Sequence, residues 1–219
     1  MNYFGIDKLY ILVLMKRRFL FLANPITGKN GISELKAACE QSLNDGNYHW
    51  DILATEYAGH ASELTTLHKD NYNTIVAVGG DGTINEIAKS LINSKTSLGI
   101  VPNGSGNGLA RHLGISLNIN QAVQDLISSK PTKIDVAWAN DIPFFNVAGI
   151  GFDALVAKKF QSTKKRGFMN YILISAKEFL KFSYPTLHLE TNSSHIECKQ
   201  VFSLTIANGS QLGNNAVVA

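Results

Sequence analysis

The sequence predicts an α/β protein, with a parallel α/β domain over residues 15–133 and a partial β-rich domain over residues 134–219. Short apolar runs alternate with segments of helical periodicity in the first region, which is typical of a parallel sheet covered by helices. Loops rich in glycine or asparagine follow three of these runs. After Lys130-Pro131-Thr132 the pattern changes to paired strands around one helix, so we expect a domain boundary there. Residues 1–14 are expected to be an N-terminal extension.

The apolar runs of the first region have the length and composition of buried parallel strands. Residues 19–23 are apolar throughout and end at Asn24-Pro25, and residues 74–78 end at three glycines around one aspartate. Strands covered by helices on both faces have this composition. In this chain we expect parallel strands at residues 19–23, 50–54, 74–78 and 98–101.

Segments with helical spacing follow the strands. Ile84, Ile87, Ala88 and Leu91 recur at i, i+3, i+4 and i+7, which is the period of one helix face. Helices are expected at residues 32–43 and 60–68, from 84, from 109, and at 121–129. In the second region strands are expected at residues 134–139, 143–150, 186–190 and 200–207, and a helix at 168–182.

Composition excludes several classes of protein. The chain has 219 residues, 45% of them hydrophobic, and its formal charge of +3 gives no reason to expect a nucleic-acid partner. Its two cysteines, Cys39 and Cys198, lie far apart without metal-ligand spacing, which favours a reduced, cytoplasmic protein. The apolar residues 9–15 are fewer than the roughly 20 that span a bilayer. We therefore expect no membrane-spanning helix and no cleaved signal, with a short interfacial anchor at residues 1–14 as the alternative.

The turn at Gly79-Gly80-Asp81-Gly82-Thr83 is the most informative motif. It joins a predicted strand to a predicted helix, and such a turn presents backbone N–H groups and the positive end of a helix dipole at one point. This arrangement suits a phosphate group. The alternative is a tight turn that uses glycine only for its backbone freedom.

Two more loops of this kind strengthen the phosphate interpretation. They begin at Asn24 and Pro102, each directly after a predicted strand. In open α/β sheets ligands bind at the carboxyl ends of the strands, where all three loops would lie. The chain has neither G-x-x-x-x-G-K-[ST] nor, at Gly104-Ser105-Gly106, the dinucleotide fingerprint G-x-G-x-x-G.

These loops resemble the diacylglycerol kinase catalytic-domain family, which includes bacterial lipid kinases and the sphingosine and ceramide kinases. The resemblance rests on four segments that occur in the family's order. They are Asn24-Pro25-x-x-Gly28, Gly79-Gly80-Asp81-Gly82-Thr83-x-Asn85-Glu86, Pro102-x-Gly104-Ser105-x-Asn107 and Asn146-x-x-Gly149-x-Gly151-Phe152-Asp153-Ala154.

The resemblance implies a fold like that of NAD kinase and diacylglycerol kinase, with a C-terminal β-sandwich that is incomplete here. It implies ATP and Mg²⁺ as cofactors, and ATP between the two domains. The implied activity transfers the γ-phosphoryl group to a hydroxyl of diacylglycerol or a related lipid, as in phospholipid biosynthesis. The implied ATP-contacting residues are Asn24, Pro25, Ile26, Thr27, Gly28, Thr55, Gly80, Asp81, Gly82, Thr83, Ile84, Asn85, Glu86 and Ser105.

Asp81 is the expected catalytic residue. Its carboxylate could hold Mg²⁺ through water, or orient or deprotonate the acceptor hydroxyl, while a turn-forming aspartate is the alternative. Arg111 is interpreted as a structural residue that ties down the third loop. His60 is interpreted as a surface residue, with ATP contact as the alternative.

Two departures from the family pattern leave the reaction open. Gly108 stands where the bacterial diacylglycerol kinases usually carry aspartate, so Gly104-Ser105-Gly106-Asn107 is closer to the sphingosine and ceramide kinases. The family's general base is expected beyond Ala219, so we expect a truncated member. A kinase of sphingoid lipid or NAD and a non-catalytic nucleotide-binding protein stay open as alternatives.

A lipid acceptor would bring the protein to the inner face of a membrane. Lys158, Lys159, Lys164, Lys165 and Arg166 form a basic stretch that suits peripheral contact with anionic lipid. A solvated loop before a core helix is an equally good interpretation. A homodimer stays open.

Overall fold

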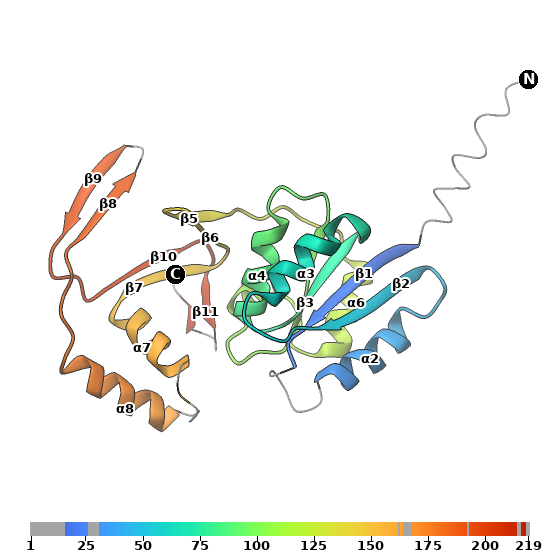
Figure 1. The fold of residues 1–219 in the computed structure, drawn as a ribbon, viewed down its shortest axis with the longest axis horizontal. Helices are drawn as coiled ribbons and strands as arrows, with labels where there is room; N and C mark the ends of the chain where they lie inside the picture. Colours follow the sequence, from blue (N-terminus) through green and yellow to red (C-terminus); the bar gives the residue numbers. More distant parts are fainter. Residues whose placement is uncertain are drawn as a thin grey trace, which may run out of the picture. The chain divides into compact units, whose positions relative to one another are not determined.

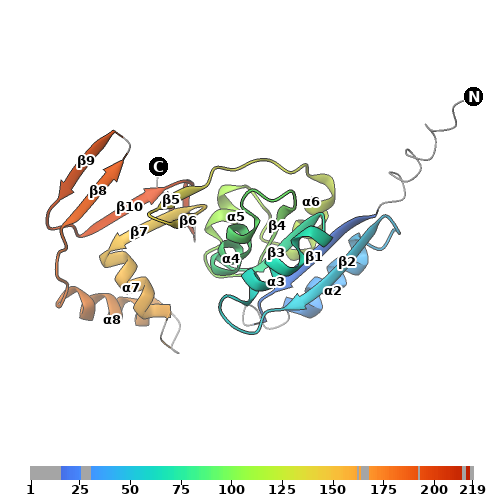
Figure 2. The same cartoon turned by 45° about the horizontal axis from the view of Figure 1, so that its top comes forward.

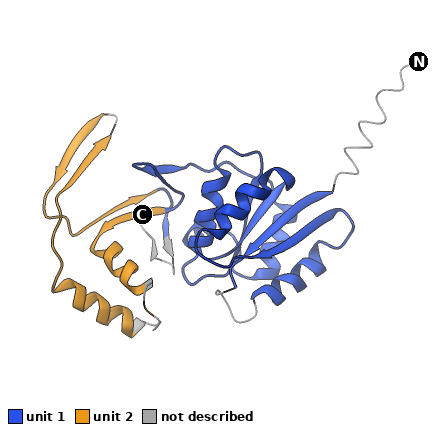
Figure 3. Cartoon of the chain, in the orientation of Figure 1, with its two compact units in different colours: residues 1–146, 208–219 blue, residues 147–207 orange. Residues whose placement is uncertain are grey.

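The computed structural model describes residues 16–25, 31–161, 163, 168–191, 193–213 and 216–217. The chain divides into two compact units, residues 1–146 with 208–219 and residues 147–207 (Figure 3). Residues 134–146 thus group with the first unit, while the domain boundary after residue 133 stays a prediction. The expected extension, residues 1–14, lies outside the described residues.

The first unit is built on a four-stranded parallel sheet, as predicted (Figure 1). Its strands lie in the order β2-β1-β3-β4, and β1 pairs with both β2 and β3. The strands are β1 (Arg17–Ala23), β2 (Tyr48–Ala54), β3 (Thr74–Gly79) and β4 (Ser97–Pro102). The predicted strands are confirmed, each within about two residues of its expected ends.

Helices cover both faces of the sheet (Figure 2). On one face α2 (Gly31–Ser42) and α6 (Ile119–Ser128) pack on alternate strand residues such as Phe19 and Phe21. On the other, α3 (His60–His68), α4 (Asp81–Leu91) and α5 (Gly108–His112) pack on Leu20 and Ile75. Every residue from Phe19 to Ala23 is buried, which explains why apolar and polar residues do not alternate along this strand. The fold class expected from the sequence is therefore confirmed for this unit.

Short elements complete the first unit. They are the 3₁₀ turn η1 (Lys69–Asn71), the hairpin of β5 (Ala137–Ala139) and β6 (Ile142–Phe144), and the pair of β11 (Gln211–Gly213) and β12 (Ala216–Val217). Asn208 and Gly209 both donate backbone hydrogen bonds to the carbonyl of Asn146, at 2.7 and 3.0 Å. These bonds tie the late segment of the chain back to the first unit.

The second unit contains two antiparallel strand pairs and two helices. Strand β7 (Val147–Gly151) pairs with β10 (Ser203–Ala207), and β8 (Leu187–Thr191) pairs with β9 (Ser194–Cys198). In the sequence, α7 (Phe152–Gln161) and α8 (Phe168–Phe179) lie between β7 and β8. The ring of Phe152 is the centre of an aromatic cluster, 4.9 Å from Phe202, 5.4 Å from Phe182 and 5.9 Å from Phe179 between centroids.

The sequence did not predict α7. Its Phe152, Val156 and Phe160 recur at helical spacing, but the basic stretch that begins at Lys158 is also typical of a solvated loop. Lys158 and Lys159 lie in the last helical turn of α7, whereas Lys164, Lys165 and Arg166 lie outside the described residues. Among the helices that the structure describes, none is long and apolar enough to cross a membrane.

The buried Cys39 thiol gives a test of the packing between α2 and the sheet. Burial raises its pKa from 9.0 to about 12, and the charge of Glu40 adds to the shift. Since the thiolate is the nucleophile, we expect a thiol reagent at pH 8 to label only Cys198 in the native protein and both cysteines in urea. The free energy of unfolding should also fall as the pH rises above 9, because only the unfolded thiol then ionises. Equal labelling rates in the native protein would contradict this packing.

Candidate functional site

The three predicted loops meet at the carboxyl edge of the parallel sheet. At the end of each pair of neighbouring strands, one further backbone hydrogen bond aligns the first residues of the loops. These bonds are Thr55 N–H to Ala23 O at 2.9 Å, Asn24 N–H to Val78 O at 3.0 Å, and Asn103 N–H to Gly79 O at 2.8 Å. The ends of β2, β1, β3 and β4 therefore form one continuous edge.

A topological switch point lies in this edge. The chain leaves β1 for β2 on one side, and then returns to β3 on the other side of β1. Loops that leave neighbouring strands toward opposite faces open a crevice between them, and ligands of open α/β sheets bind there. The switch point lies between β1 and β3, where Asn24 and the Gly79–Gly82 turn follow the strands.

The N-terminus of α4 lies at the switch point. The helix begins at Asp81, three residues before the predicted start, so Gly82 and Thr83 belong to its first turn. Gly80 precedes the helix in an extended conformation and offers no capping side chain. The first N–H groups of a helix have no partner within it. The turn therefore presents hydrogen-bond donors and the positive end of the helix dipole at the crevice.

The loop after β4 packs directly against this turn. A Cβ atom on Gly104 would lie 2.4 Å from Gly80 Cα and 2.9 Å from Asn107 Oδ1, so the two backbones approach as closely as glycine permits. Asn107 closes the loop on itself, because its side chain accepts from Gly104 N–H at 3.0 Å and donates to Gly104 O at 2.8 Å. The residue is 6% exposed and has a positive φ of 52°.

Asp81 joins the two loops through its carboxylate. Oδ1 accepts a hydrogen bond from the backbone N–H of Leu109 at 3.3 Å, and a Cβ on Gly106 would lie 3.0 Å from Oδ2. The residue is nevertheless exposed, so its carboxylate is accessible to a ligand from solvent. Asp81 therefore has both a structural contact and an open position.

Arg111 ties down the same loop, which confirms its predicted structural role. Its Nε donates to the carbonyl of Gly106 at 3.2 Å. The side chain lies on the short helix α5, directly after the loop that it holds. This bond restricts the position of Gly106. Because Gly106 lies against Asp81 Oδ2, it also restricts the position of the Asp81 carboxylate.

The remaining predicted ATP residues differ in what they can present. Thr55 and Thr83 are 8% and 7% exposed, and Thr83 Oγ1 lies against Gly79. Ile84 is in the core, and its N–H donates to Gly80 O at 3.1 Å. Pro25, Asn85 and Ser105 are exposed, whereas Asn24 is half-buried and has a hydrogen-bonding partner. Glu86 accepts from Gly59 N–H at 3.0 Å, and Ile26, Thr27 and Gly28 lie outside the described residues.

The donor set fits a magnesium ion that is shared with a ligand rather than held by the protein alone. Within the described part of the chain, no group of three or more His, Cys, Asp or Glu side chains gathers at one point. Mg²⁺ in nucleotide sites is usually bound by one or two carboxylates, substrate phosphates and water. Asp81 supplies one exposed carboxylate of this kind, beside a helix N-terminus that suits a phosphate.

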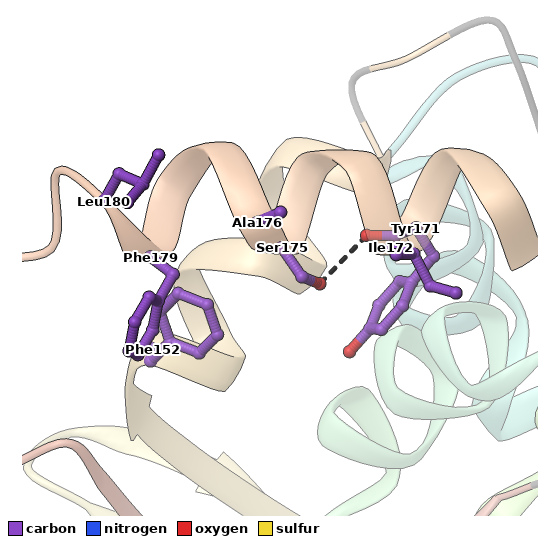
Figure 4. Close-up of a pocket in the computed structure, with 7 residues that line it drawn as sticks. All are labelled: Phe152, Tyr171, Ile172, Ser175, Ala176, Phe179 and Leu180. Carbon is purple, nitrogen blue, oxygen red and sulfur yellow. Dashed lines mark hydrogen bonds between the residues drawn. The ribbon is translucent and has the colours of Figure 1, made fainter.

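The second unit contains an apolar groove of about 580 Å³ (Figure 4). One end is formed by the Phe152 and Phe179 rings, and the Ser175 hydroxyl in its wall donates to Tyr171 O at 2.9 Å. Beside it Leu180 is 86% exposed and Phe179 is 54% exposed. The lining residues are Phe152, Tyr171, Ile172, Ser175, Ala176, Phe179 and Leu180.

Comparisons with known proteins agree with the fold and the loops. The family model described as the diacylglycerol kinase catalytic domain matches residues 18–139. A diacylglycerol kinase of Staphylococcus aureus is 31% identical over 140 residues, which cover 63% of this chain and 44% of that enzyme. An uncharacterised protein of Synechocystis sp. is 34% identical over 136 residues, or 61% of this chain and 31% of that protein.

Solved structures show the same fold. A diacylglycerol kinase from Bacillus anthracis str. Sterne superposes with a TM-score of 0.66 at 24% identity, covering 90% of this chain and 66% of that one. The sequence match to the Staphylococcus enzyme spans less than half of that enzyme's length. Since the family model covers more than half of the residues, the chain belongs to the diacylglycerol kinase catalytic-domain family.

Proposed function

We propose that this protein is an ATP-dependent lipid kinase, which transfers the γ-phosphoryl group of ATP to a hydroxyl of diacylglycerol or a related lipid. One observation carries the proposal: the uncapped first turn of α4 and the Asp81 carboxylate lie together at the switch point of a parallel sheet. Membership of the diacylglycerol kinase family supports the choice of reaction.

The phosphates of ATP bind at the glycine turn. The backbone N–H groups of Asp81, Gly82 and Thr83 donate to phosphate oxygens, with the helix dipole adding to the attraction. Thr83 contributes its backbone, because its buried hydroxyl lies against Gly79. Among the described residues, nothing within 4 Å would meet a Cβ at Gly82, so these residues leave space for a ligand there. Ser105 and Asn85 offer exposed polar side chains at the rim of the same site.

Asp81 would hold the magnesium ion that this chemistry requires. A carboxylate beside phosphates would repel them unless a cation lay between the two charges. When bound, Mg²⁺ neutralises charge on the transferred phosphoryl group and its leaving group. Asp81 would position the ion, and its contact with Leu109 N–H fixes the carboxylate relative to the loop after β4.

The acceptor is a lipid that the protein reaches at the cytoplasmic face of a membrane. The apolar groove of the second unit has a size and lining that suit an acyl chain. Lys158 and Lys159, in the last turn of α7, add positive charge in the same unit. Anionic lipid attracts such residues by about 1 kcal/mol each near the surface.

The acceptor class is tested by incubating the protein with γ-labelled ATP, Mg²⁺ and four acceptors: diacylglycerol, sphingosine, ceramide and NAD. We expect label in diacylglycerol or in one of the other two lipids. Label in NAD alone would contradict a lipid kinase. Binding of ATP without transfer to any acceptor would favour a nucleotide-binding role, which the partial match to the Staphylococcus enzyme keeps as the second candidate.

Membrane contact gives a separate prediction. Replacing Leu180 by aspartate should weaken binding to vesicles of anionic phospholipid about tenfold, because a leucine gains roughly 1.5–3 kcal/mol on leaving water. Leu67→Asp is the matched control, since Leu67 is 70% exposed on α3 of the first unit. Vesicle co-sedimentation measures both variants. Equal binding by the two variants would exclude the groove as the contact site.

A further inference from the structure

An ordered aromatic pair lies in the loop between β2 and α3. The rings of Tyr57 and His60 are stacked, with centroids 4.6 Å apart and planes inclined by 7°. Tyr57 is nevertheless 55% exposed. The histidine therefore covers one face of the tyrosine ring, and much of the remaining ring surface is open to solvent.

Hydrogen bonds hold both rings in place. The Tyr57 hydroxyl donates to Glu63 Oε2 at 2.7 Å, and this bond to the protonated phenol raises the pKa of Tyr57. The backbone N–H of Glu56 donates to His60 Nδ1 at 3.1 Å, which holds the imidazole ring beside the tyrosine. Exposed tyrosines usually rotate among rotamers, whereas this one is fixed at its hydroxyl and along one face.

The backbone of the loop is anchored as well. Thr55 N–H extends the β1–β2 ladder, and Gly59 N–H donates to Glu86 Oε1 on α4. Gly59 adopts a φ of 95°, which turns the chain sharply into α3. The ring pair is thus attached through Glu86 to the helix whose N-terminus forms the candidate phosphate site.

The position of the pair relative to that site follows from the sheet. Tyr57 comes three residues after the end of β2, and β2 is separated from β3 by β1 alone. Neighbouring strands lie about 4.8 Å apart, so the carboxyl ends of β2 and β3 are about 10 Å apart. A nucleotide that runs along this edge from phosphates at α4 toward β2 would bring its base to the loop after β2.

We infer that the open face of Tyr57 stacks on the nucleobase, with His60 as its rigid backing, so that this pair is the base-binding platform of the nucleotide site. The inference rests on the proposed function, because it takes the phosphates to lie at the first turn of α4. Stacking on an aromatic face tolerates any base, so the platform increases affinity for the nucleoside without choosing between adenine and guanine.

The experiment separates the base from the phosphates. Isothermal titration of the full 219-residue chain, with Mg²⁺ present, measures the affinities of ATP, GTP and inorganic tripolyphosphate. Tyr57→Ala should weaken ATP and GTP about tenfold, a typical effect of losing one base–aromatic stack. Its affinity for tripolyphosphate should be unchanged. Tyr57→Phe keeps the ring and loses only the bond to Glu63, so its ATP affinity should stay within about twofold of wild type.

The contrary outcomes distinguish a failure of the platform from a failure of the phosphate site. Wild-type affinity of Tyr57→Ala for ATP would overturn the platform while leaving the phosphate site intact. Equal losses for ATP and tripolyphosphate would also overturn it, since the tyrosine would then act on the phosphates. A wild-type protein that binds neither ligand would overturn the proposed function, and the platform with it.

Discussion

The Asp81→Asn variant is expected to lose phosphoryl transfer by two to three orders of magnitude. The substitution removes the negative charge that positions Mg²⁺, and metal ions supply several kcal/mol of charge stabilisation in such reactions. The side chain otherwise keeps its size. Transfer of label from γ-labelled ATP to the accepted lipid measures the loss.

Asparagine is the informative replacement because it preserves the structural contact. Its side-chain oxygen can still accept the hydrogen bond from Leu109 N–H, which Asp81→Ala would remove. The free energy of unfolding of Asp81→Asn should therefore match wild type. Its ATP affinity should also lose its dependence on Mg²⁺, which titration with and without the metal would detect. Unchanged transfer by Asp81→Asn would show that this carboxylate has no catalytic role.

The Gly104→Ala variant is expected to lose about 1–3 kcal/mol of unfolding free energy, the usual cost of overpacking. Its added methyl would lie 2.4 Å from Gly80 Cα, where neither backbone can move without separating the loops. Because Gly80 precedes the first turn of α4, the same displacement should also weaken ATP binding. Urea denaturation and titration measure the two effects.

Gly82→Ala is the matched control in the same site. A Cβ at Gly82 would meet none of the described residues within 4 Å, and alanine favours a helical turn. This variant should keep or slightly gain stability, yet bind ATP more weakly because the methyl occupies the space proposed for the phosphates. Equal stability of Gly104→Ala and wild type would contradict the close packing of the two loops. Wild-type ATP affinity of Gly82→Ala would contradict the phosphate site.

The sequence predicted the parallel sheet well because its central strands, β1 and β3, are buried on both faces. The run from Phe19 to Ala23 is continuous and apolar, and helix-period segments follow it. These patterns depend on local composition, so they are visible in one sequence. The convergence of the three loops followed from the rule for strand ends, without any knowledge of strand order.

Contacts within the site were harder to predict, because they depend on distances between separate loops. Asn107 was noticed only as part of a family motif, although its positive φ and its two hydrogen bonds to Gly104 close the loop. The bond of Glu86 to Gly59 joins residues 27 positions apart and has no local signal. Helix α7 was missed because the basic stretch that begins in its last turn is also typical of a solvated loop.

The central claim is that the phosphates of ATP bind at the first turn of α4. Nuclear magnetic resonance of the backbone amides tests it most directly, by comparing ATP, tripolyphosphate and adenosine as ligands. We expect ATP and tripolyphosphate to shift the amide signals of Gly80, Gly82 and Thr83, while adenosine leaves these three signals unchanged. Phosphate-dependent shifts that appear elsewhere and spare these three residues would contradict the proposed site.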